Sequence, residues 1–172
     1  MTHSVRDLDD DDVEALQRLI ESFPAYTERI TGYPPGPSDA RSALTAVPPD
    51  FDRRGKQSIG LWDGEELIAF ADVLLGYPDP ATAYIGLLLV HGDRHGQGLG
   101  RELHNAVLDR IRRDTDAQRV RLGVVETNAA AAPFWEALGY AATEERKPYR
   151  YDTLRSTVAI WERSVRSPAP RR

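Results

Sequence analysis

The sequence predicts an α/β fold built on a mixed β-sheet. In the middle of the chain, strand-like apolar runs alternate with helix-like patterns. An Asp-Gly pair at positions 63–64 separates two apolar runs, which is typical of a β-hairpin. The run YIGLLLV (84–90) is apolar throughout and predicts a fully buried central strand. We expect one domain over residues 1–165 and a disordered tail over 166–172.

Composition and charge narrow the class of protein. The net charge is −5 and no block is rich in Lys or Arg, so the electrostatic signature of a nucleic-acid-binding protein is absent. The chain has no cysteine, which excludes disulfides, thiolate metal sites and a cysteine nucleophile. No stretch approaches the roughly 20 apolar residues of a membrane span. We therefore expect a cytoplasmic protein without nucleic-acid or membrane partners.

The N-terminal third predicts a strand, a helix and a long irregular segment. SVRDL (4–8) alternates like a short strand, and DDDDVEALQRLIESF (9–23) has apolar residues at helical spacing. Its aspartates favour the positive end of the helix dipole, and a run of this kind is usually a solvated cap. Residues 23–55 are rich in Pro and Gly, so we expect loops there, with one short helix near 38–44.

The remaining elements follow in order. The hairpin occupies 56–76, and Asp72 in its second strand faces either solvent or a cleft. After the buried strand, apolar residues recur every four positions from Leu99 to Ile111, which predicts a helix. A strand is expected at 119–127. A helix at 128–138 is expected next, with Asn128 as its N-cap and Gly139 at its left-handed end. Pro133 implies that this helix either bends or starts late. One or two strands close the fold over 149–165.

Three glycines, at 96, 98 and 100, stand between the buried strand and the Leu99–Ile111 helix. No lysine follows them as in a Walker loop, and a dinucleotide fingerprint would need glycine at position 103, which is leucine. One reading is a tight strand–helix turn. The other is a loop that presents the unpaired N–H groups of a helix N-terminus to a pyrophosphate.

Two segments resemble motifs of the GNAT superfamily of N-acetyltransferases. HGQGLG (95–100) is similar to the cofactor loop [Q/R]-x-x-G-x-[G/A], and NAAAAPFWEALGY (128–140) is similar to a second family motif. The resemblance extends over roughly residues 4–163 and rests on both motifs in this order. It implies a mixed, mostly antiparallel central sheet of six to seven strands, splayed at its central strands, with about four helices.

The resemblance implies that acetyl-CoA is the cofactor. Backbone groups of Leu88, Leu89 and Val90 would pair with its pantetheine arm. His95 stands where Gln or Arg is usual in the family. Trp135 stands where many members carry a tyrosine that donates a proton to the leaving thiolate. The general acid is therefore missing or has moved, with Tyr140, Tyr149 and Tyr151 as candidates. The cofactor residues implied by the two motifs are His95, Gly96, Gln97, Gly98, Leu99, Gly100, Arg101, Asn128 and Trp135.

The same resemblance points to candidate catalytic residues. Tyr84 holds a position where some relatives carry a glutamate, and an aromatic residue there is more often a core or cleft-lining side chain than a catalyst. Glu126 is the carboxylate nearest the motifs, and its alternative role is a solvated charge at a strand end. Tyr26, Tyr33 and Asp72 would contact the acceptor.

We therefore expect an N-acetyltransferase that moves an acetyl group directly to a primary amine of a small molecule in a ternary complex. The acceptor could be an antibiotic, an amino acid or a polyamine. The alternatives are a non-catalytic CoA-binding or sensing domain and a protein N-terminal or lysine acetyltransferase. No metal is expected, because His91, Asp93 and His95 are too tightly spaced to favour a site. The resemblance also allows a homodimer.

Overall fold

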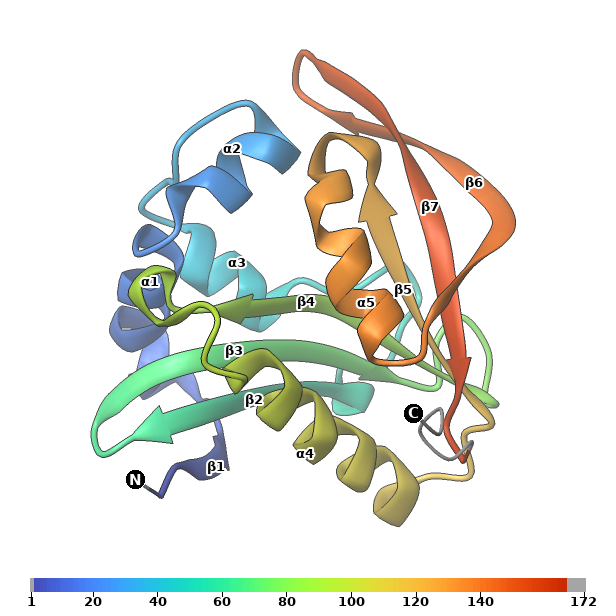
Figure 1. Cartoon of the computed structure of the whole chain (residues 1–172), viewed down its shortest axis with the longest axis horizontal. Helices are drawn as coiled ribbons and strands as arrows, with labels where there is room; N and C mark the ends of the chain where they lie inside the picture. The colour runs from blue at the N-terminus through green and yellow to red at the C-terminus, as the bar shows by residue number, and fades with distance from the viewer. Residues whose placement is uncertain (1, 167–172) are drawn as a thin grey trace.

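The computed structural model describes residues 2–166, which form seven strands and five α-helices (Figure 1). The strands make one sheet in the order β1-β2-β3-β4-β5-β7-β6. Neighbouring strands run antiparallel except for β4 and β5, which are parallel. This confirms the predicted mixed, mostly antiparallel sheet. The strands are β1 (Ser4–Asp7), β2 (Lys56–Asp63), β3 (Glu66–Leu75), β4 (Thr82–Val90), β5 (Arg119–Val125), β6 (Ala141–Tyr151) and β7 (Leu154–Ser164).

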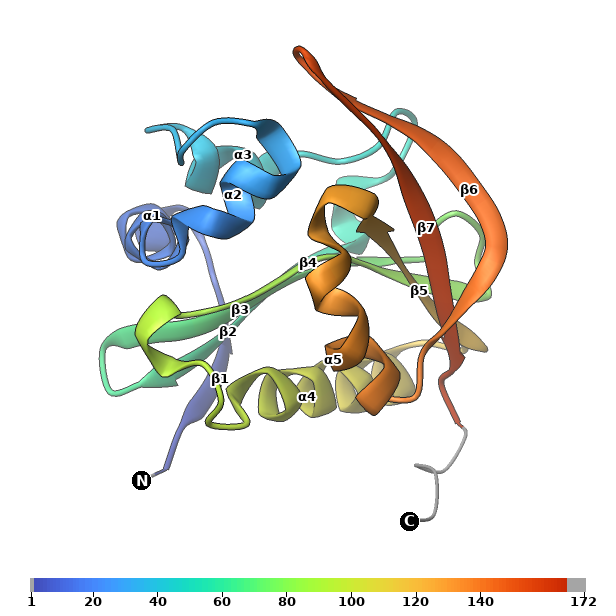
Figure 2. The same cartoon turned by 45° about the horizontal axis from the view of Figure 1, so that its top comes forward.

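Helices cover both faces of the sheet (Figure 2). α1 (Val13–Glu21), α2 (Pro24–Thr31) and α3 (Asp39–Thr45) lie over one face, whereas α4 (Leu99–Asp114) and α5 (Ala132–Ala137) pack on the other. Helix α2 was not predicted, because the segment was read as loop around one helix. It begins with a proline in its first turn and ends at Gly32, whose φ of 83° is left-handed. These are the ordinary start and stop signals of a helix.

The alternation of side chains along β3 creates two cores. Phe70 packs with Leu16 and Leu19 of α1 on one face, while Ala71 belongs to the cluster on the other face. That second cluster includes Leu103, Val107 and Ile111 of α4, and all are buried. A central strand that is buried on both faces fixes the register of the sheet, since a slip by one residue would exchange the two cores.

The central strands separate at a bulge, which confirms the predicted splay. The β3–β4 register shifts between Asp72 and Val73, so Gly86 is the unpaired residue of β4. Pairing between β4 and β5 ends at Ile85–Leu122. Gly86 is exposed, and Leu88 is only half-buried. The prediction of a fully buried strand is therefore wrong for its second half, which has lost one neighbour.

Two local expectations also change, and a third is confirmed. The aspartate run is more than a solvated cap, because Asp12 is buried and accepts two hydrogen bonds of 2.9 Å from Arg6. Asn128 makes no capping hydrogen bond, because α5 starts only at Ala132, with Pro133 in its first turn. Gly139 does take the predicted left-handed conformation, with φ of 89°. Except for Arg166, the predicted tail lies outside the described residues. No helix within residues 2–166 is long and apolar enough to cross a membrane.

A buried histidine joins α4 to the start of β6. His104 is fully buried, and its Nε2 lies 2.8 Å from the Tyr140 hydroxyl. Its Nδ1 has no hydrogen-bond partner among the described residues. Burial, aided by nearby arginines, lowers the pKa of His104 to about 3. The ring is therefore neutral in the folded protein at neutral pH.

Stability should consequently fall in acid through His104. Because its pKa is near 3 when folded and near 6.5 when unfolded, its contribution is complete above pH 6.5 and is lost as the pH falls toward 3. The slope from this group reaches about 1.4 kcal/mol per pH unit. The double variant His104→Leu/Tyr140→Phe should show a shallower slope in urea unfolding between pH 6.5 and 4.5. Parallel slopes for the two proteins would contradict this account.

Candidate functional site

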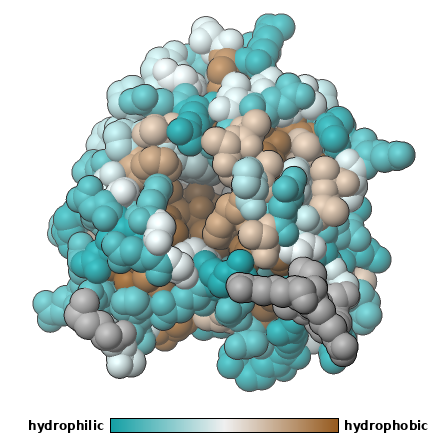
Figure 3. All heavy atoms as spheres, in the orientation of Figure 1, coloured by the Kyte–Doolittle hydropathy of each residue, from teal (hydrophilic) through white to brown (hydrophobic). Residues whose placement is uncertain are grey.

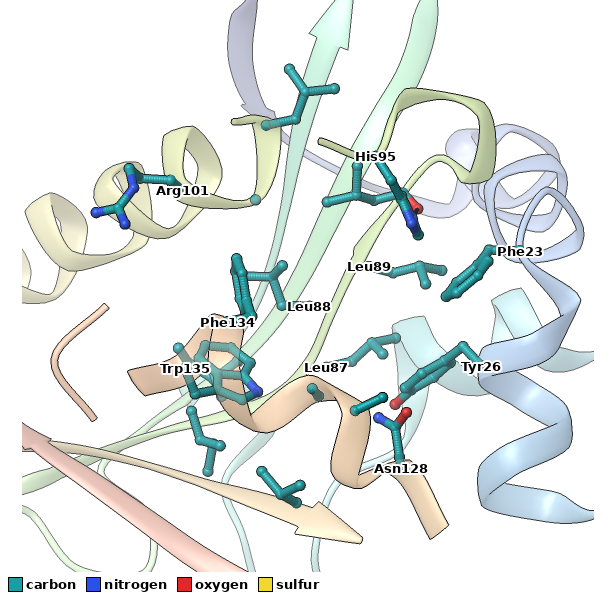
Figure 4. A pocket seen from close by; sticks show the side chains of 18 of the residues that line it. Phe23, Tyr26, Leu87, Leu88, Leu89, His95, Arg101, Asn128, Phe134 and Trp135 are labelled. Atoms are coloured by element: carbon teal, nitrogen blue, oxygen red, sulfur yellow. Dashed lines mark hydrogen bonds between the residues drawn. The ribbon is translucent and has the colours of Figure 1, made fainter. Parts of the chain in front are cut away.

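A cavity of about 500 Å³ lies where β4 and β5 part. It opens as an apolar hollow on the surface (Figure 3) and runs between the two helical layers (Figure 4). Cavities of this size are typical of small-molecule and cofactor sites. Its lining comes from α2, β4, the glycine loop, β5 and the α5 region: Phe23, Tyr26, Arg29, Ile85–Val90, Arg94–Gly96, Gly98–Arg101, Leu122–Val124, Asn128, Ala130, Ala131, Phe134, Trp135 and Ala137.

The glycine loop brings an open helix N-terminus to this cavity. Gly96 and Gly98 have φ of 78° and 79°, so the turn uses conformations that suit glycine. No side chain caps α4. The hydrogen bonds found among residues 2–166 include none from the backbone N–H groups of His95 through Arg101. Free N–H groups and the helix dipole together favour an anion at this end of the cavity.

Gly100 is required for a different reason. A Cβ built on it would lie 2.8 Å from the Phe134 ring of α5. Close packing of α4 against the α5 segment therefore excludes a side chain here. Of the three glycines in the motif, two shape the loop and one allows the two helices to touch.

The charged side chains of the loop point elsewhere. Arg94 forms ion pairs with Asp63 and Glu66. Arg101 bends away from the cavity and donates a 3.3 Å hydrogen bond to the Ala137 carbonyl (Figure 4). Anion binding would therefore depend on the backbone, with Arg29 of α2 as a further guanidinium in the lining.

The second half of β4 presents its free edge to the cavity. Leu88, Leu89 and Val90 all line it, as the cofactor prediction required. The side chain of His95 turns back toward this edge, with its Nε2 3.0 Å from the Val90 carbonyl oxygen. Its ring also packs edge-on against Phe23, with centroids 4.5 Å apart. His95 thus stabilises the loop against the strand and already occupies one acceptor of the free edge.

Trp135 is a packed wall of the cavity. It is buried between Phe134, His104 and Tyr140, at ring-centroid distances of 4.9, 6.3 and 5.3 Å. Its indole nitrogen faces the cavity (Figure 4). An indole N–H can donate a hydrogen bond but is a very poor acid. Trp135 is therefore unsuited to donate a proton in any chemistry at this cavity.

Two further glycines mark the point where β4 and β5 separate. Gly86 and Gly123 directly follow the last paired residues, and both line the cavity. A Cβ on Gly86 would lie 2.9 Å from Asp72 Oδ2, and a Cβ on Gly123 would lie 3.0 Å from the Tyr84 hydroxyl. Each missing side chain therefore leaves room for a polar group. Asp72 and Tyr84 lie beside these glycines on the sheet face that α1–α3 cover, and neither is among the residues that line the cavity.

Tyr84 has the properties of a candidate proton donor. Its hydroxyl has no hydrogen-bond partner among the described residues, and its ring packs edge-on against Tyr77 at 5.6 Å. Burial raises the pKa of Tyr84, so the hydroxyl carries its proton at neutral pH. Of the other candidate tyrosines, Tyr151 is exposed and lies outside the cavity lining, and two are engaged elsewhere. Tyr140 bonds to His104, and the Tyr149 hydroxyl donates to the Ile30 carbonyl at 2.6 Å.

The remaining predicted residues are dispersed. Tyr26 and Asn128 line the cavity, and Asn128 accepts a long 3.4 Å hydrogen bond from Arg29. Glu126 is exposed and lies outside the cavity lining, without an ion pair among residues 2–166. Gln97 is also outside the lining.

Tyr33 lies at the outer rim, where its hydroxyl contacts the Asp152 carboxylate of the β6–β7 turn. Together with the Tyr149–Ile30 bond, this contact ties the α2 region to the β6–β7 hairpin. The rim beside the cleft is thus closed by two links between segments far apart in the sequence.

Gly86 and Gly123 were not identified as site residues from the sequence. A glycine inside an apolar strand is a known sign of a bulge, and Gly86 carried that sign. Within residues 2–166, no group of three or more His, Asp or Glu side chains is arranged to hold a metal ion. The Asp93 backbone N–H donates to His91 Nδ1 at 3.2 Å, whereas His95 turns to Val90.

Comparison with known proteins places this geometry in a family. A model of the acetyltransferase (GNAT) family matches residues 16–140. An acetyltransferase from Thermus thermophilus superposes with a TM-score of 0.74 at 25% identity, over 95% of this chain and 97% of that one. No curated protein matches the chain significantly.

Two other solved structures share the fold at lower identity. The ribosomal-protein-S18-alanine N-acetyltransferase from Escherichia coli has a TM-score of 0.68 at 20% identity, over 99% of both chains. A probable acetyltransferase from Staphylococcus epidermidis has a TM-score of 0.74 at 12% identity, over 95% of this chain and 99% of that one.

The close contact at Gly100 can be tested by overpacking. Gly100→Ala should destabilise the protein by about 1–3 kcal/mol, because the new methyl group meets Phe134. Adding Phe134→Leu should relieve part of that loss, which a double-mutant cycle in urea unfolding would measure. If the effects of the two substitutions on the free energy of unfolding are additive, contact with the Phe134 ring is not the reason that position 100 excludes a side chain.

Proposed function

Because the chain belongs to the acetyltransferase (GNAT) family, we propose that it transfers an acetyl group from acetyl-CoA to a primary amine of a small molecule. Transfer is direct, within a complex of enzyme, donor and acceptor. The observation that carries the proposal is the continuous cleft between β4 and β5. An uncapped helix N-terminus lies at one end of this cleft. At the other end the lining includes Gly86 and Gly123, and Asp72 and Tyr84 lie directly beside these glycines, outside the lining.

The residues of the cleft fit a coenzyme A thioester. The N–H groups of 95–101 would hold its pyrophosphate, and the free edge of β4 at Leu88 and Leu89 would pair with the pantetheine amides. Trp135, Phe134 and Asn128 would form the opposite wall. When bound, this donor supplies an activated acetyl group. His95 would release or share the Val90 carbonyl as the arm enters.

The protein's own groups would manage protons at the closed end of the cleft. The overall change joins the acceptor nitrogen to the acetyl carbon and breaks the thioester C–S bond. A cationic amine gives up two protons, the departing sulfur takes one, and one reaches solvent. Tyr84, whose hydroxyl lies beside Gly123 of the cavity lining, would donate the proton to sulfur. Asp72 would orient the amine, and the first proton would leave through Asp72 or through water. Glu126, at the exposed strand end, would serve only through an intervening water.

The rim favours a small acceptor. The Tyr33–Asp152 and Tyr149–Ile30 links close the side between α2 and the β6–β7 hairpin. This narrows the space that an extended polypeptide would need. Acids on this face are largely neutralised, since Arg121 forms ion pairs with both Glu145 and Glu162. An amine attached to an apolar or aromatic body therefore fits better than a polyamine. A cytoplasmic location and a homodimer remain parts of the proposal.

A thiol-release screen tests the function directly. We expect the purified protein to bind CoA in calorimetry and to release free thiol from acetyl-CoA with at least one amine of a broad panel. Mass spectrometry should show a product heavier by one acetyl group. Binding without turnover on every amine and peptide tested would instead support a non-catalytic sensing domain.

Tyr84→Phe should lower kcat by about 100-fold or more, because general acid catalysis contributes roughly 100- to 10,000-fold. Affinity for CoA should stay within about twofold, since the pyrophosphate end is untouched. Tyr77→Phe is the matched control, because it removes a hydroxyl from the same aromatic stack. Equal kcat values for the two variants would remove Tyr84 from the mechanism.

A further inference from the structure

We propose that Lys56 is a positioning residue for the acceptor amine: it fixes the Asp72 carboxylate through one oxygen and presents the other oxygen, ionised, to the bulge at Gly86. This inference rests on the proposed function and extends it to a residue on β2, two strands away from the cleft. The class of ligand that such a carboxylate would receive is a protonated primary amine.

The two oxygens of Asp72 have different surroundings. Lys56 Nζ lies 2.5 Å from Oδ1. Oδ2 lies over Gly86, at the position where a side chain of that residue would collide with it. Gly86 itself is exposed and lines the cavity. One oxygen is thus bound by Lys56, and the other lies next to Gly86, which lines the cavity although Asp72 itself does not.

The Lys56–Asp72 ion pair is largely buried, but part of the Asp72 side chain is accessible to solvent. The side chain of Lys56 is 6% exposed and that of Asp72 is 16% exposed. A surface ion pair would be screened and would orient little, whereas a pair at this depth holds its geometry. A purely structural pair would be expected to enclose both oxygens, because unsatisfied carboxylate oxygens are costly to bury.

Charge near Asp72 comes from Lys56. Burial raises the pKa of Asp72, and the hydrogen bond and charge of Lys56 oppose that rise. Helix α1 packs on this face of β3 through apolar residues, including Leu16 and Leu19. From β4, Tyr84 brings a titratable hydroxyl to the same face. Without Lys56, the carboxylate would have burial but no compensating cation, and its proton would be held to higher pH.

The test uses an acceptor found in the thiol-release screen and follows kcat and KM from pH 5.5 to 9. In Lys56→Met, kcat/KM for the acceptor should fall about tenfold or more at pH 6.5 and partly recover at high pH. The reason is that the acid limb moves upward by about 1–2 pH units. Lys56→Arg should retain most activity. In Asp72→Asn, kcat/KM for the acceptor should be low at every pH. Acetyl-CoA affinity should be unchanged in all three.

Two further proteins separate positioning from folding. Lys56→Met/Asp72→Asn removes both charges, so its Tm should return toward wild type while its activity stays low. Lys147→Met, which breaks an exposed pair with Glu145, should leave the pH profile unaltered. If the wild type is active and the pH profile of Lys56→Met is not shifted, the role of Lys56 is overturned and the proposed function stands. Recovered activity in the double variant would have the same meaning. A wild type that binds CoA but acetylates no amine would overturn both this role and the proposed function.

Discussion

The architecture of the site depends on the end of backbone pairing between β4 and β5 after Ile85–Leu122. Within a sheet, backbone N–H and C=O groups are normally satisfied by the neighbouring strand. Here β4 keeps its pairing with β3 and loses its other neighbour, so a row of polar groups faces a cavity. A strand with one open edge is a template for an extended ligand. The bulge at Gly86 supplies the extra residue that lets the strands diverge.

Helix packing determines which groups lie at each end of the cleft. α4 packs along one face of the sheet through Leu103, Val107 and Ile111, which fixes its N-terminus at the wide end of the cleft. Gly100 lets the α5 region close against it. The opposite face carries the polar groups of the narrow end. In the proposed function, the end that would bind the anion and the end that would transfer protons are thus separated along one strand, on opposite sides of the sheet.

Two residues of the cleft depart from the family motif. Trp135 stands where many members carry a tyrosine and forms an apolar wall, and in the proposed mechanism Tyr84, beside Gly123, would donate the proton instead. His95 replaces a longer polar side chain and turns to the Val90 carbonyl instead. The backbone N–H groups of the loop are then the main feature left to attract phosphate, consistent with the engagement of Arg94 and Arg101 elsewhere.

The sequence by itself determined the mixed sheet, the hairpin at Asp63-Gly64, the α4 stripe and the glycine loop, because each depends on local periodicity or on a backbone conformation that few residues adopt. It missed α2, whose proline and glycine limits were read as loop signals. Only the tertiary structure decided which side chains meet. The approach of Asp72 to Gly86, of Tyr84 to Gly123, and of Lys56 to Asp72 depends on strand register and on a bulge. Gly86 was a local sign of the bulge, but the strand register that brings these side chains together is a long-range property that no local pattern of residues encodes.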